Sequence, residues 1–499
     1  MNYIQHFILT QKPYYQAITK ILRSITPCAS KQELIKITPV FSLFFFISFV
    51  FHLLHCLKKT LILKASGGAE IIPFIQVWLV MPSSILFTWA YMRLAKKPNR
   101  QPLIYCTLGL FGVFFTIFMV FLYPYKDQLY LSNLADTLKQ QLPDNLSYIA
   151  QVVRYWPEAL FYVMSEMWSI IVLSILFWGF CNETTKLEEA KRFYAIIALG
   201  ANCAGILSGQ FMQIISKYFS SSWLQSITIF LSSLIISCIL ITFIFIKINN
   251  RQNLDKQSIQ EDTNLNIKAS DHNKHKVAFS ESIKYIIRYK YITLLAIMVI
   301  GYNMVFNLAD LVWLDQINRR FTSPDELNNY LAQLDFLIGI FSLIIGLFVF
   351  SNIINKFGWK ITALIPPIVW LISSICLYTA LFAEKFGFNL NTLILILGTL
   401  QISTGKAVKY CIFDQVKEIT FIPLSIEQQK NSKAVIDGII SRIGKSGGSI
   451  IIQGFLIFGI GEIIAITPVI TISIIITIFV WIYATNKLGK LMTNERYLN

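Results

Sequence analysis

Apolar runs long enough to cross a lipid bilayer recur along almost the whole chain, and this feature restricts the possible folds more than any other. A transmembrane helix needs about 20 mostly apolar residues. We expect roughly twelve such helices, at 38–57, 71–95, 103–123, 159–180, 193–217, 223–247, 291–313, 331–351, 359–383, 389–409, 436–458 and 463–484. The sequence therefore predicts an all-α polytopic membrane protein.

The composition agrees with this prediction. Of the 499 residues, 55% are hydrophobic and 14% are charged, and the mean hydropathy is +0.58. A soluble domain has about 25% charged residues, so the low charged fraction indicates a lipid bilayer as the surroundings of most of the chain.

The formal net charge of +16 raises the question of nucleic acid as a partner. The basic residues gather in segments that we expect on the cytoplasmic side, whereas the expected outside loop at 124–158 is mixed in charge. This distribution follows the positive-inside rule with both termini in the cytoplasm. Because no basic patch is interleaved with aromatic residues, the sequence does not indicate nucleic-acid binding.

Neither the cysteines nor the histidines indicate a metal site, and we expect no cofactor. The eight cysteines are scattered and form no CxxC pair, so neither a disulfide framework nor a zinc site is predicted. His52 and His55 share one helical face, but we expect no carboxylate or thiol to join them. We therefore interpret them as a packed or cavity-lining pair.

A polar stretch of mixed charge at 248–282 divides the expected helices into two sets of six. We interpret it as a flexible cytoplasmic linker. The predicted organisation is a cytoplasmic segment, a first six-helix half, the linker, a second six-helix half and a cytoplasmic tail, at 1–37, 38–247, 248–282, 283–485 and 486–499. Two such halves are typical of secondary transporters. We expect a major-facilitator-like architecture, in which the first and fourth helices of each half line the central cavity.

Ionisable residues within the expected spans indicate where that cavity lies, because charges in hydrocarbon are costly and usually face a pathway. They fall in the first and fourth helices of both halves and in helix 11: Lys58, Lys59, Glu166, Asp310, Lys406, Lys409, Asp437, Arg442 and Lys445. An alternative is that lysines at helix ends extend to the membrane surface. Glu166 and Lys406 lie deeper in their spans, so this alternative suits them less.

A cavity ringed by several lysines, an arginine and carboxylates suits a polyanion such as a phosphate chain. The carboxylates would hold ribose hydroxyls or a base edge, or else carry a coupling proton. Three tryptophans near the charged positions are candidates for stacking on a base, although packing is the commoner role: Trp168, Trp178 and Trp313.

The stretch SRIGKSGGSIIIQ at 441–453 contains Gly-Lys-Ser, which occurs in loops that bind phosphate. A P-loop needs G-x-x-x-x-G-K-[ST] between a strand and a helix. Here the required first glycine is Ile439, and both flanks are apolar spans. We therefore predict that this stretch allows close helix packing or lets Lys445 and Arg442 reach the cavity. Without a P-loop the chain is not expected to be an ATP-driven pump or another enzyme.

Four long stretches resemble the nucleotide transporters (ATP/ADP translocases) of obligate intracellular bacteria and plastids. They are GGAEIIPFIQVWLVMPSSILF at 67–87, EMWSIIVLSILFWGFCNETTKLEEAKRFY at 166–194, KYCIFDQVKEITFIPL at 409–424 and SKAVIDGIISRIGKSGG at 432–448. The resemblance runs from about residue 30 to 490. It implies a twelve-helix major-facilitator fold, nucleotide transport, and a place in the inner membrane of an intracellular bacterium rather than a plastid envelope.

The resemblance also implies which residues are functional. Basic and acidic residues important in the family correspond to Lys58, Glu166, Asp310 and Lys417, and further residues lie in matching motifs. Together with the charge pattern, this predicts substrate contacts from Lys58, Lys59, Glu166, Asn182, Asp310, Lys406, Lys409, Asp414, Lys417, Arg442 and Lys445.

The chain departs from the family pattern at two places. The family typically reads Arg-x-x-Lys-Asp at the end of helix 1 and Asn-Leu-Val-Glu-x-x-Trp-Lys in helix 7. Here an arginine, an aspartate and a lysine are replaced by His55, Lys59 and Leu314. We expect nucleotide exchange by alternating access. The alternative is proton-coupled net uptake, for example of GTP, CTP or UTP, with His55, Glu166 and Asp310 as candidate proton carriers.

Overall fold

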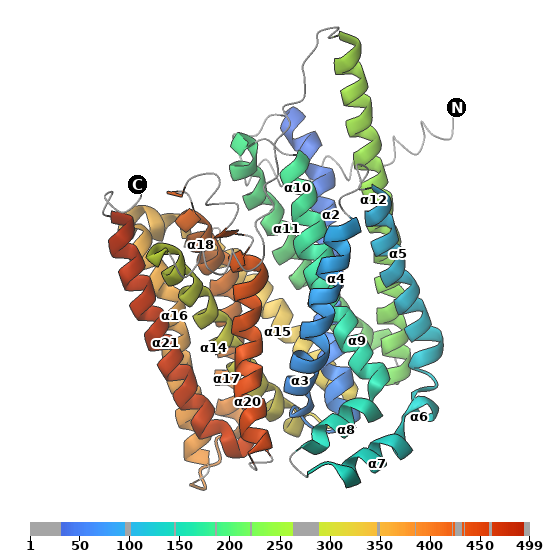
Figure 1. The fold of residues 1–499 in the computed structure, drawn as a ribbon, viewed down its shortest axis with the longest axis vertical. Helices are drawn as coiled ribbons and strands as arrows, with labels where there is room; N and C mark the ends of the chain where they lie inside the picture. The colour runs from blue at the N-terminus through green and yellow to red at the C-terminus, as the bar shows by residue number, and fades with distance from the viewer. Residues whose placement is uncertain are drawn as a thin grey trace.

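The computed structural model describes most of the chain, and its elements are helices (Figure 1). The described residues are 31–94, 101–143, 146–184, 187–219, 222–262, 289–346, 350–384, 386–421, 423–424, 432–433, 435–458 and 462–493. Two bundles lie side by side (Figure 1). We term residues 31–262 the first bundle and residues 289–493 the second bundle.

The first bundle contains six long helical segments and several short helices. Elements marked η have wider, π-helical turns. The bounds are α2 Lys31–Ser66, α3 Ile71–Phe74, η1 Ile75–Val80, α4 Met81–Leu94, α5 Gln101–Ile117, η2 Phe118–Leu122, α6 Lys126–Leu129, α7 Ser132–Gln141, α8 Ser147–Arg154, α9 Trp156–Met167, η4 Trp168–Phe177, α10 Trp178–Thr184, α11 Leu187–Ile214, η5 Ile215–Phe219 and α12 Trp223–Asp262. The short helices α6, α7 and α8 lie at one end of the molecule, and the C-terminal end of α12 lies at the other (Figure 1).

The second bundle follows the same plan of long helices with short interruptions. The bounds are α14 Lys290–Arg320, α15 Pro324–Ile344, α16 Phe350–Glu384, α17 Asn391–Val408, η7 Lys409–Phe413, α18 Asp414–Phe421, η8 Ile436–Ile440, α20 Ser441–Ile457 and α21 Ile463–Thr493. The C-terminal ends of α12 and α21 lie at the same end of the molecule (Figure 1).

Local sequence explains where α15 starts and where α16 bends. The hydroxyl of Ser323 accepts a hydrogen bond from the backbone N–H of Glu326 at 3.1 Å, and Pro324 follows at the first helical position. Both residues favour a helix start. Gly358 interrupts the helical backbone of α16 with a φ of 72°, a conformation that glycine adopts without steric cost.

Nine helical segments in the described part of the chain are long and apolar enough to cross a membrane. The other expected spans, 193–217, 389–409 and 436–458, are also helical and correspond to α11 with η5, α17 with η7, and η8 with α20. The prediction of an all-α polytopic fold is therefore confirmed, and the chain is a multi-pass membrane protein.

Several expected boundaries differ from the structure. Helix α2 continues to Ser66, α15 covers Pro324–Ile344 rather than 331–351, and α12 continues to Asp262 through the start of the expected linker. The lysine pair in α2 is not the end of its span, because its side chains are buried within the bundle. Residues 263–282 of the expected linker lie outside the described residues.

The two bundles contact each other closely where α11 packs against α15. Two glycines allow this approach. A Cβ atom on Gly209 would lie 2.6 Å from the backbone oxygen of Ala332, and a Cβ atom on Gly339 would lie 2.6 Å from a side-chain carbon of Ile206. Small residues at helix interfaces allow such backbone proximity in membranes, so this contact holds α11 and α15 at a fixed separation.

Candidate functional site

Charged residues from four helices of the two bundles come together. They are Lys58 and Lys59 on α2, Glu166 on α9, Asp310 on α14 and Lys406 on α17. These helices are the first and fourth of each expected half. Lys58 and Lys59 are only 6% and 4% exposed, so the alternative that these lysines extend to the membrane surface is wrong.

The two adjacent lysines of α2 form ion pairs with different bundles. Lys58 donates to Glu166 within the first bundle. Lys59 Nζ lies 2.9 Å from each carboxylate oxygen of Asp310 in the second bundle. The ammonium of Lys58 also lies 4.9 Å from the centre of the Tyr162 ring, a favourable cation–π distance. Buried charges of both signs are therefore paired, as burial in hydrocarbon requires.

A hydrogen-bonded network beside these pairs joins α9 and α14 to two further segments, η1 and α20. Gln76 Nε2 donates to the Tyr162 hydroxyl at 3.1 Å, and Asn307 Nδ2 donates to Gln76 Oε1 at 3.0 Å. The Ser449 hydroxyl contacts Gln76 Oε1 and lies 3.1 Å from Asn307 Oδ1. The sequence analysis did not single out these residues. The sequence signal that could have indicated them is an amide side chain inside an apolar span, as at Gln76 and Asn307.

The glycine-rich stretch at 441–453 forms most of α20 and packs against α14. A Cβ atom on Gly444 would lie 2.8 Å from Asn303 Cβ, and one on Gly448 would lie 2.6 Å from Asn307 Oδ1. The segment is helical rather than a loop between a strand and a helix. Close helix packing, one of the two roles predicted for this stretch, thus agrees with the geometry.

Arg442 and Lys445 of the same helix face a different environment from the paired lysines. Lys445 is exposed and Arg442 is partly exposed. Neither forms an ion pair or a hydrogen bond with another residue that the structure describes, although Lys445 interacts electrostatically with Glu166 and Lys58. These two cations are therefore open to an anion that enters from solvent.

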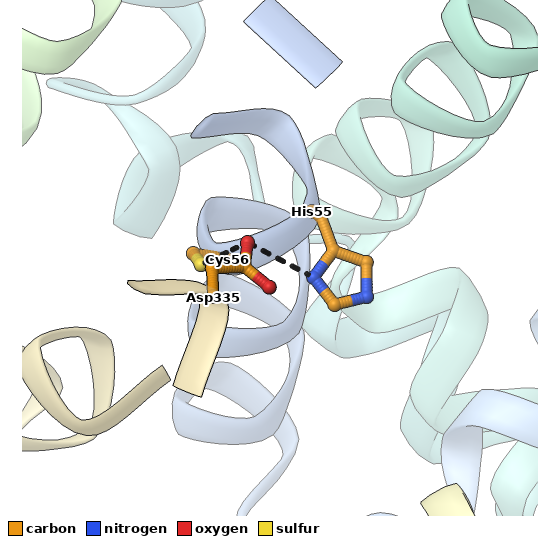
Figure 2. Close-up of side chains that lie close together, drawn as sticks. All are labelled: His55, Cys56 and Asp335. Carbon is orange, nitrogen blue, oxygen red and sulfur yellow. Dashed lines mark hydrogen bonds and ion pairs between the residues drawn. The ribbon is translucent and has the colours of Figure 1, made fainter. Parts of the chain in front are cut away.

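One carboxylate from α15 joins the two histidines of α2, so the expectation that no carboxylate or thiol joins them is wrong. Asp335 Oδ2 lies 3.1 Å from His52 Nδ1, 3.8 Å from His55 Nδ1 and 3.5 Å from Cys56 Sγ. Figure 2 shows His55 and Cys56 on α2 directed toward Asp335. His55 Nε2 in turn lies 3.2 Å from Lys406 Nζ. Asp335 was missed because it lies 283 positions from His52.

A cavity between the bundles connects these groups. Its lining includes His55, Lys59, Asp310, Asp335 and Lys406, together with Trp313, three leucines and Ile402. Of the three tryptophans proposed for base stacking, Trp313 thus lines the cavity. Trp168 is fully buried and donates to the backbone oxygen of Ile47 at 3.2 Å, which is a packing role.

The remaining predicted residues lie beyond the central ion pairs. Lys409 pairs with Asp414 at 3.2 Å, and Lys417 on α18 pairs with Asp437 at 2.5 Å. Burial alone would lower the pKa of Lys417, but Asp437, Asp414 and Glu418 outweigh burial and raise this pKa. Lys417 therefore joins α18 to η8 as a cation. Asn182 lies in α10, and its side chain lies outside the described residues.

Sequence comparison shows to which family the chain belongs. The family model described as the TLC ATP/ADP transporter matches residues 13–492. The chain belongs to the TLC ATP/ADP transporter family. The resemblance found in the sequence is therefore confirmed.

Relatives of this TLC-family chain occur in bacteria and plants. ADP,ATP carrier protein 1 of Chlamydia muridarum is 36% identical over 485 residues, which cover 94% of this chain and 91% of that protein. The plastidic ATP/ADP-transporter of Solanum tuberosum is 32% identical over 481 residues, which cover 92% of this chain and 74% of that protein.

Solved structures similar to the TLC-family chain are transporters of other solutes, and they show the fold alone. A crystal structure of a bacterial homologue of the iron transporter ferroportin in the inward-facing state has a TM-score of 0.58 at 13% identity, covering 92% of this chain and all of that one. A D-xylose–proton symporter has a TM-score of 0.54 at 14% identity, covering 91% of this chain and 96% of that one. The expected major-facilitator-like fold is confirmed.

The departures of this chain from the TLC-family pattern meet in one place. His55, Lys59 and Leu314, which replace an arginine, an aspartate and a lysine, all line the same cavity. With His55 neutral, both sets of three residues carry a formal charge of +1. The substitutions therefore move charge within the cavity and leave its sum unchanged.

Proposed function

We propose that this chain is a secondary carrier that exchanges ATP for ADP by alternating access, without hydrolysing either nucleotide, in the inner membrane of a bacterium. The observation that carries the proposal is the lysine pair of α2, in which Lys58 binds the first bundle and Lys59 binds the second. Family membership and the names of the relatives, which are carriers and transporters of ADP and ATP, support the same substrates.

Phosphate oxygens compete well for these lysines. On its way in, a nucleotide first meets Arg442 and Lys445, which form no ion pair or hydrogen bond with another described residue. Both interact electrostatically with Glu166. The phosphate chain then replaces a carboxylate on Lys58 or Lys59, since ammonium groups bind phosphate and carboxylate oxygens alike. Displacement of Asp310 from Lys59 breaks an ion pair between the bundles and thereby loosens their contact.

The charge of the cavity favours exchange over net uptake. In the candidate site as a whole the basic groups are Lys58, Lys59, Lys406, Arg442 and Lys445, and the acidic groups are Glu166, Asp310 and Asp335. Of these, Lys59, Lys406, Asp310 and Asp335 line the cavity. With neutral histidines these groups leave a formal charge of +2. Closing a low-dielectric cavity over uncompensated charge is costly, so the carrier returns more readily with an anionic nucleotide than empty.

Contacts at the outer ends of the helices support a state that is closed on the outside. Lys64, near the end of α2, donates to the backbone oxygens of Phe321 and, at 3.4 Å, of Asn318. Asn318 Nδ2 donates to the backbone oxygen of Gly67 at 3.0 Å. The backbone N–H of Ile463 donates to Glu70 Oε1 at 3.3 Å. Alternating access requires these contacts to separate when the cavity opens outward.

The test is counterflow in proteoliposomes that contain the purified full chain. Labelled ATP, ADP, GTP, CTP and UTP are supplied outside, with and without internal ADP and with and without a protonophore. The proposal expects ATP and ADP uptake that needs internal nucleotide and is unaffected by the protonophore. Uptake that needs no internal nucleotide and stops with the protonophore would replace exchange by proton-coupled net uptake. Uptake of none of the five nucleotides would contradict nucleotide transport itself.

A further inference from the structure

Asp335 is the carboxylate at the centre of a cluster that enters the exchange mechanism above only through its charge. It comes from α15 in the second bundle and faces one turn of α2 in the first (Figure 2). Asp335 is 3% exposed, and Cys56 is completely buried. A single buried carboxylate thus contacts donors at positions 52, 55 and 56 of one helix.

The contact between His55 and Lys406 determines which ring nitrogen of His55 carries the proton. An ammonium group has only hydrogens to donate, so His55 Nε2, 3.2 Å from Lys406 Nζ, must accept. A neutral imidazole that accepts at Nε2 carries its proton at Nδ1. His55 Nδ1 faces Asp335 Oδ2 at 3.8 Å, and the carboxylate favours a proton at that nitrogen.

Lys406 differs from the other buried lysines of the site in its partner. Lys58 and Lys59 each bind a carboxylate. Lys406 contacts the neutral ring of His55 and lies 5.4 Å from the centre of the Phe306 ring, and no carboxylate that the structure describes forms an ion pair with it. A phosphate can therefore bind the Lys406 ammonium without first displacing an anion.

A metal ion is the obvious alternative occupant of the cluster. The ligand atoms of His55, Cys56 and Asp335 lie within 4.8 Å of one another, and this donor set suits zinc. Coordination through His55 Nδ1 would move the ring proton to Nε2, where it would point at the Lys406 ammonium. The outer nitrogen of a metal-bound histidine normally donates to an acceptor instead. The position of Lys406 therefore favours a hydrogen-bonded chain over a metal site.

We propose that Asp335 is a positioning residue for nucleotide binding, which acts through His55 to aim Lys406 at the phosphate chain. In this chain of contacts Asp335 holds the proton of His55 at Nδ1, His55 Nε2 accepts from Lys406, and the ammonium keeps its remaining hydrogens for phosphate oxygens. His52 and Cys56 donate to the same carboxylate and hold it in place. The inference rests on the proposed exchange of nucleotides.

The first experiment compares ATP counterflow by Asp335→Asn, Lys406→Met and the double variant. Asparagine keeps the shape of Asp335 but can donate to His55 Nδ1. The ring proton of His55 would then lie on Nε2 and point at Lys406. We expect Asp335→Asn to raise KM for ATP about tenfold or more, the range expected for a charged hydrogen bond, with a much smaller effect on the maximal rate. In the Lys406→Met background the same substitution should leave KM unchanged.

A second pair of variants tests His55, the middle residue of this chain of contacts. It keeps the proposal testable if Asp335→Asn folds poorly. Glutamine at position 55 can accept from Lys406 and donate to Asp335, whereas leucine can do neither. His55→Gln should therefore keep KM close to the wild-type value, and His55→Leu should raise it as Asp335→Asn does. Nitrogen-15 NMR of histidine-labelled protein in liposomes should show His55 protonated at Nδ1, with the assignment taken from His55→Gln.

The outcomes separate this inference from the proposed function. An equal rise in KM with and without Lys406, or a His55 proton at Nε2 in the wild type, overturns the positioning role while nucleotide exchange stands. Stoichiometric zinc in the purified wild type that is lost in Asp335→Asn also overturns it, in favour of a metal site. Absence of nucleotide uptake by the wild type removes the proposed function and the inference with it.

Discussion

Lys59 on α2 binds both carboxylate oxygens of Asp310 on α14 and so joins the two bundles. Its neighbour Lys58 binds Glu166 within the first bundle. Successive side chains of a helix point about 100° apart, which explains how adjacent lysines reach different bundles. One turn of α2 thus connects ligand binding with the contact between the bundles.

Removal of one partner from the Lys59–Asp310 pair should destabilise the protein more than removal of both. An unpaired buried charge costs about 3–5 kcal/mol. We expect Lys59→Met and Asp310→Asn each to lower the thermal unfolding temperature in detergent, and the double variant to recover most of the loss while exchange stays abolished. Lys139→Met on the exposed surface of α7 is the matched control. Additive losses in the double variant would show that the pair is not coupled.

Loss of the Glu166 charge should strongly impair exchange and leave membrane insertion intact. Glu166→Gln keeps the size of the side chain but leaves Lys58 without its anion. We expect a drop in the ATP exchange rate of about tenfold or more, because an interaction with a charged group is lost. Uptake should be compared at equal amounts of protein in the membrane. Near-normal uptake by both Glu166→Gln and Lys58→Ala would remove this ion pair from the site.

Adjacent glycines of α20 should differ sharply in their tolerance of alanine. A Cβ atom at Gly448 meets Asn307 Oδ1 at 2.6 Å, whereas one at Gly447 meets no heavy atom within 4 Å. Gly448→Ala should destabilise the protein by about 1–3 kcal/mol, the usual cost of overpacking, and impair exchange. Gly447→Ala should do neither. Equal behaviour of the two variants in thermal unfolding and uptake would contradict the packing of α20 on α14.

The contribution of Lys417 to stability should not change between pH 6 and pH 9. The folded-state pKa of Lys417 is raised above its unfolded value by its acidic neighbours, so its stabilising effect is complete below the unfolded pKa of about 10.4. It is lost only as the pH rises through the folded value. The difference in unfolding temperature between the wild type and Lys417→Met should therefore stay constant across this range. A difference that shrinks from pH 6 to pH 9 would contradict the sign of the shift.

The apolar runs were sufficient to predict the helices, because a bilayer requires long apolar segments whatever their packing. They did not predict where α2 ends. Lys58 and Lys59 resemble a membrane boundary in the sequence, and only the positions of Glu166 and Asp310 in space show that both lysines are buried pairs.

Most charged members of the site were predictable for a similar reason, since a charge stands out in an apolar span. Their neutral neighbours were not. Gln76, Asn307 and Ser449 have roles only in relation to one another, and they come from three segments far apart in the sequence. Asp335 was overlooked although it lies in an expected span, because its partners are on α2.

The shared location of His55, Lys59 and Leu314 has a consequence for how such a chain could evolve. Replacing the aspartate of the family pattern by lysine adds two positive charges to a buried cavity, and each of the other two replacements removes one. Any ancestor with only part of the set would have carried unbalanced charge where charge is least tolerated. We therefore expect related sequences to hold either the family set or this set, with single intermediates depleted by selection.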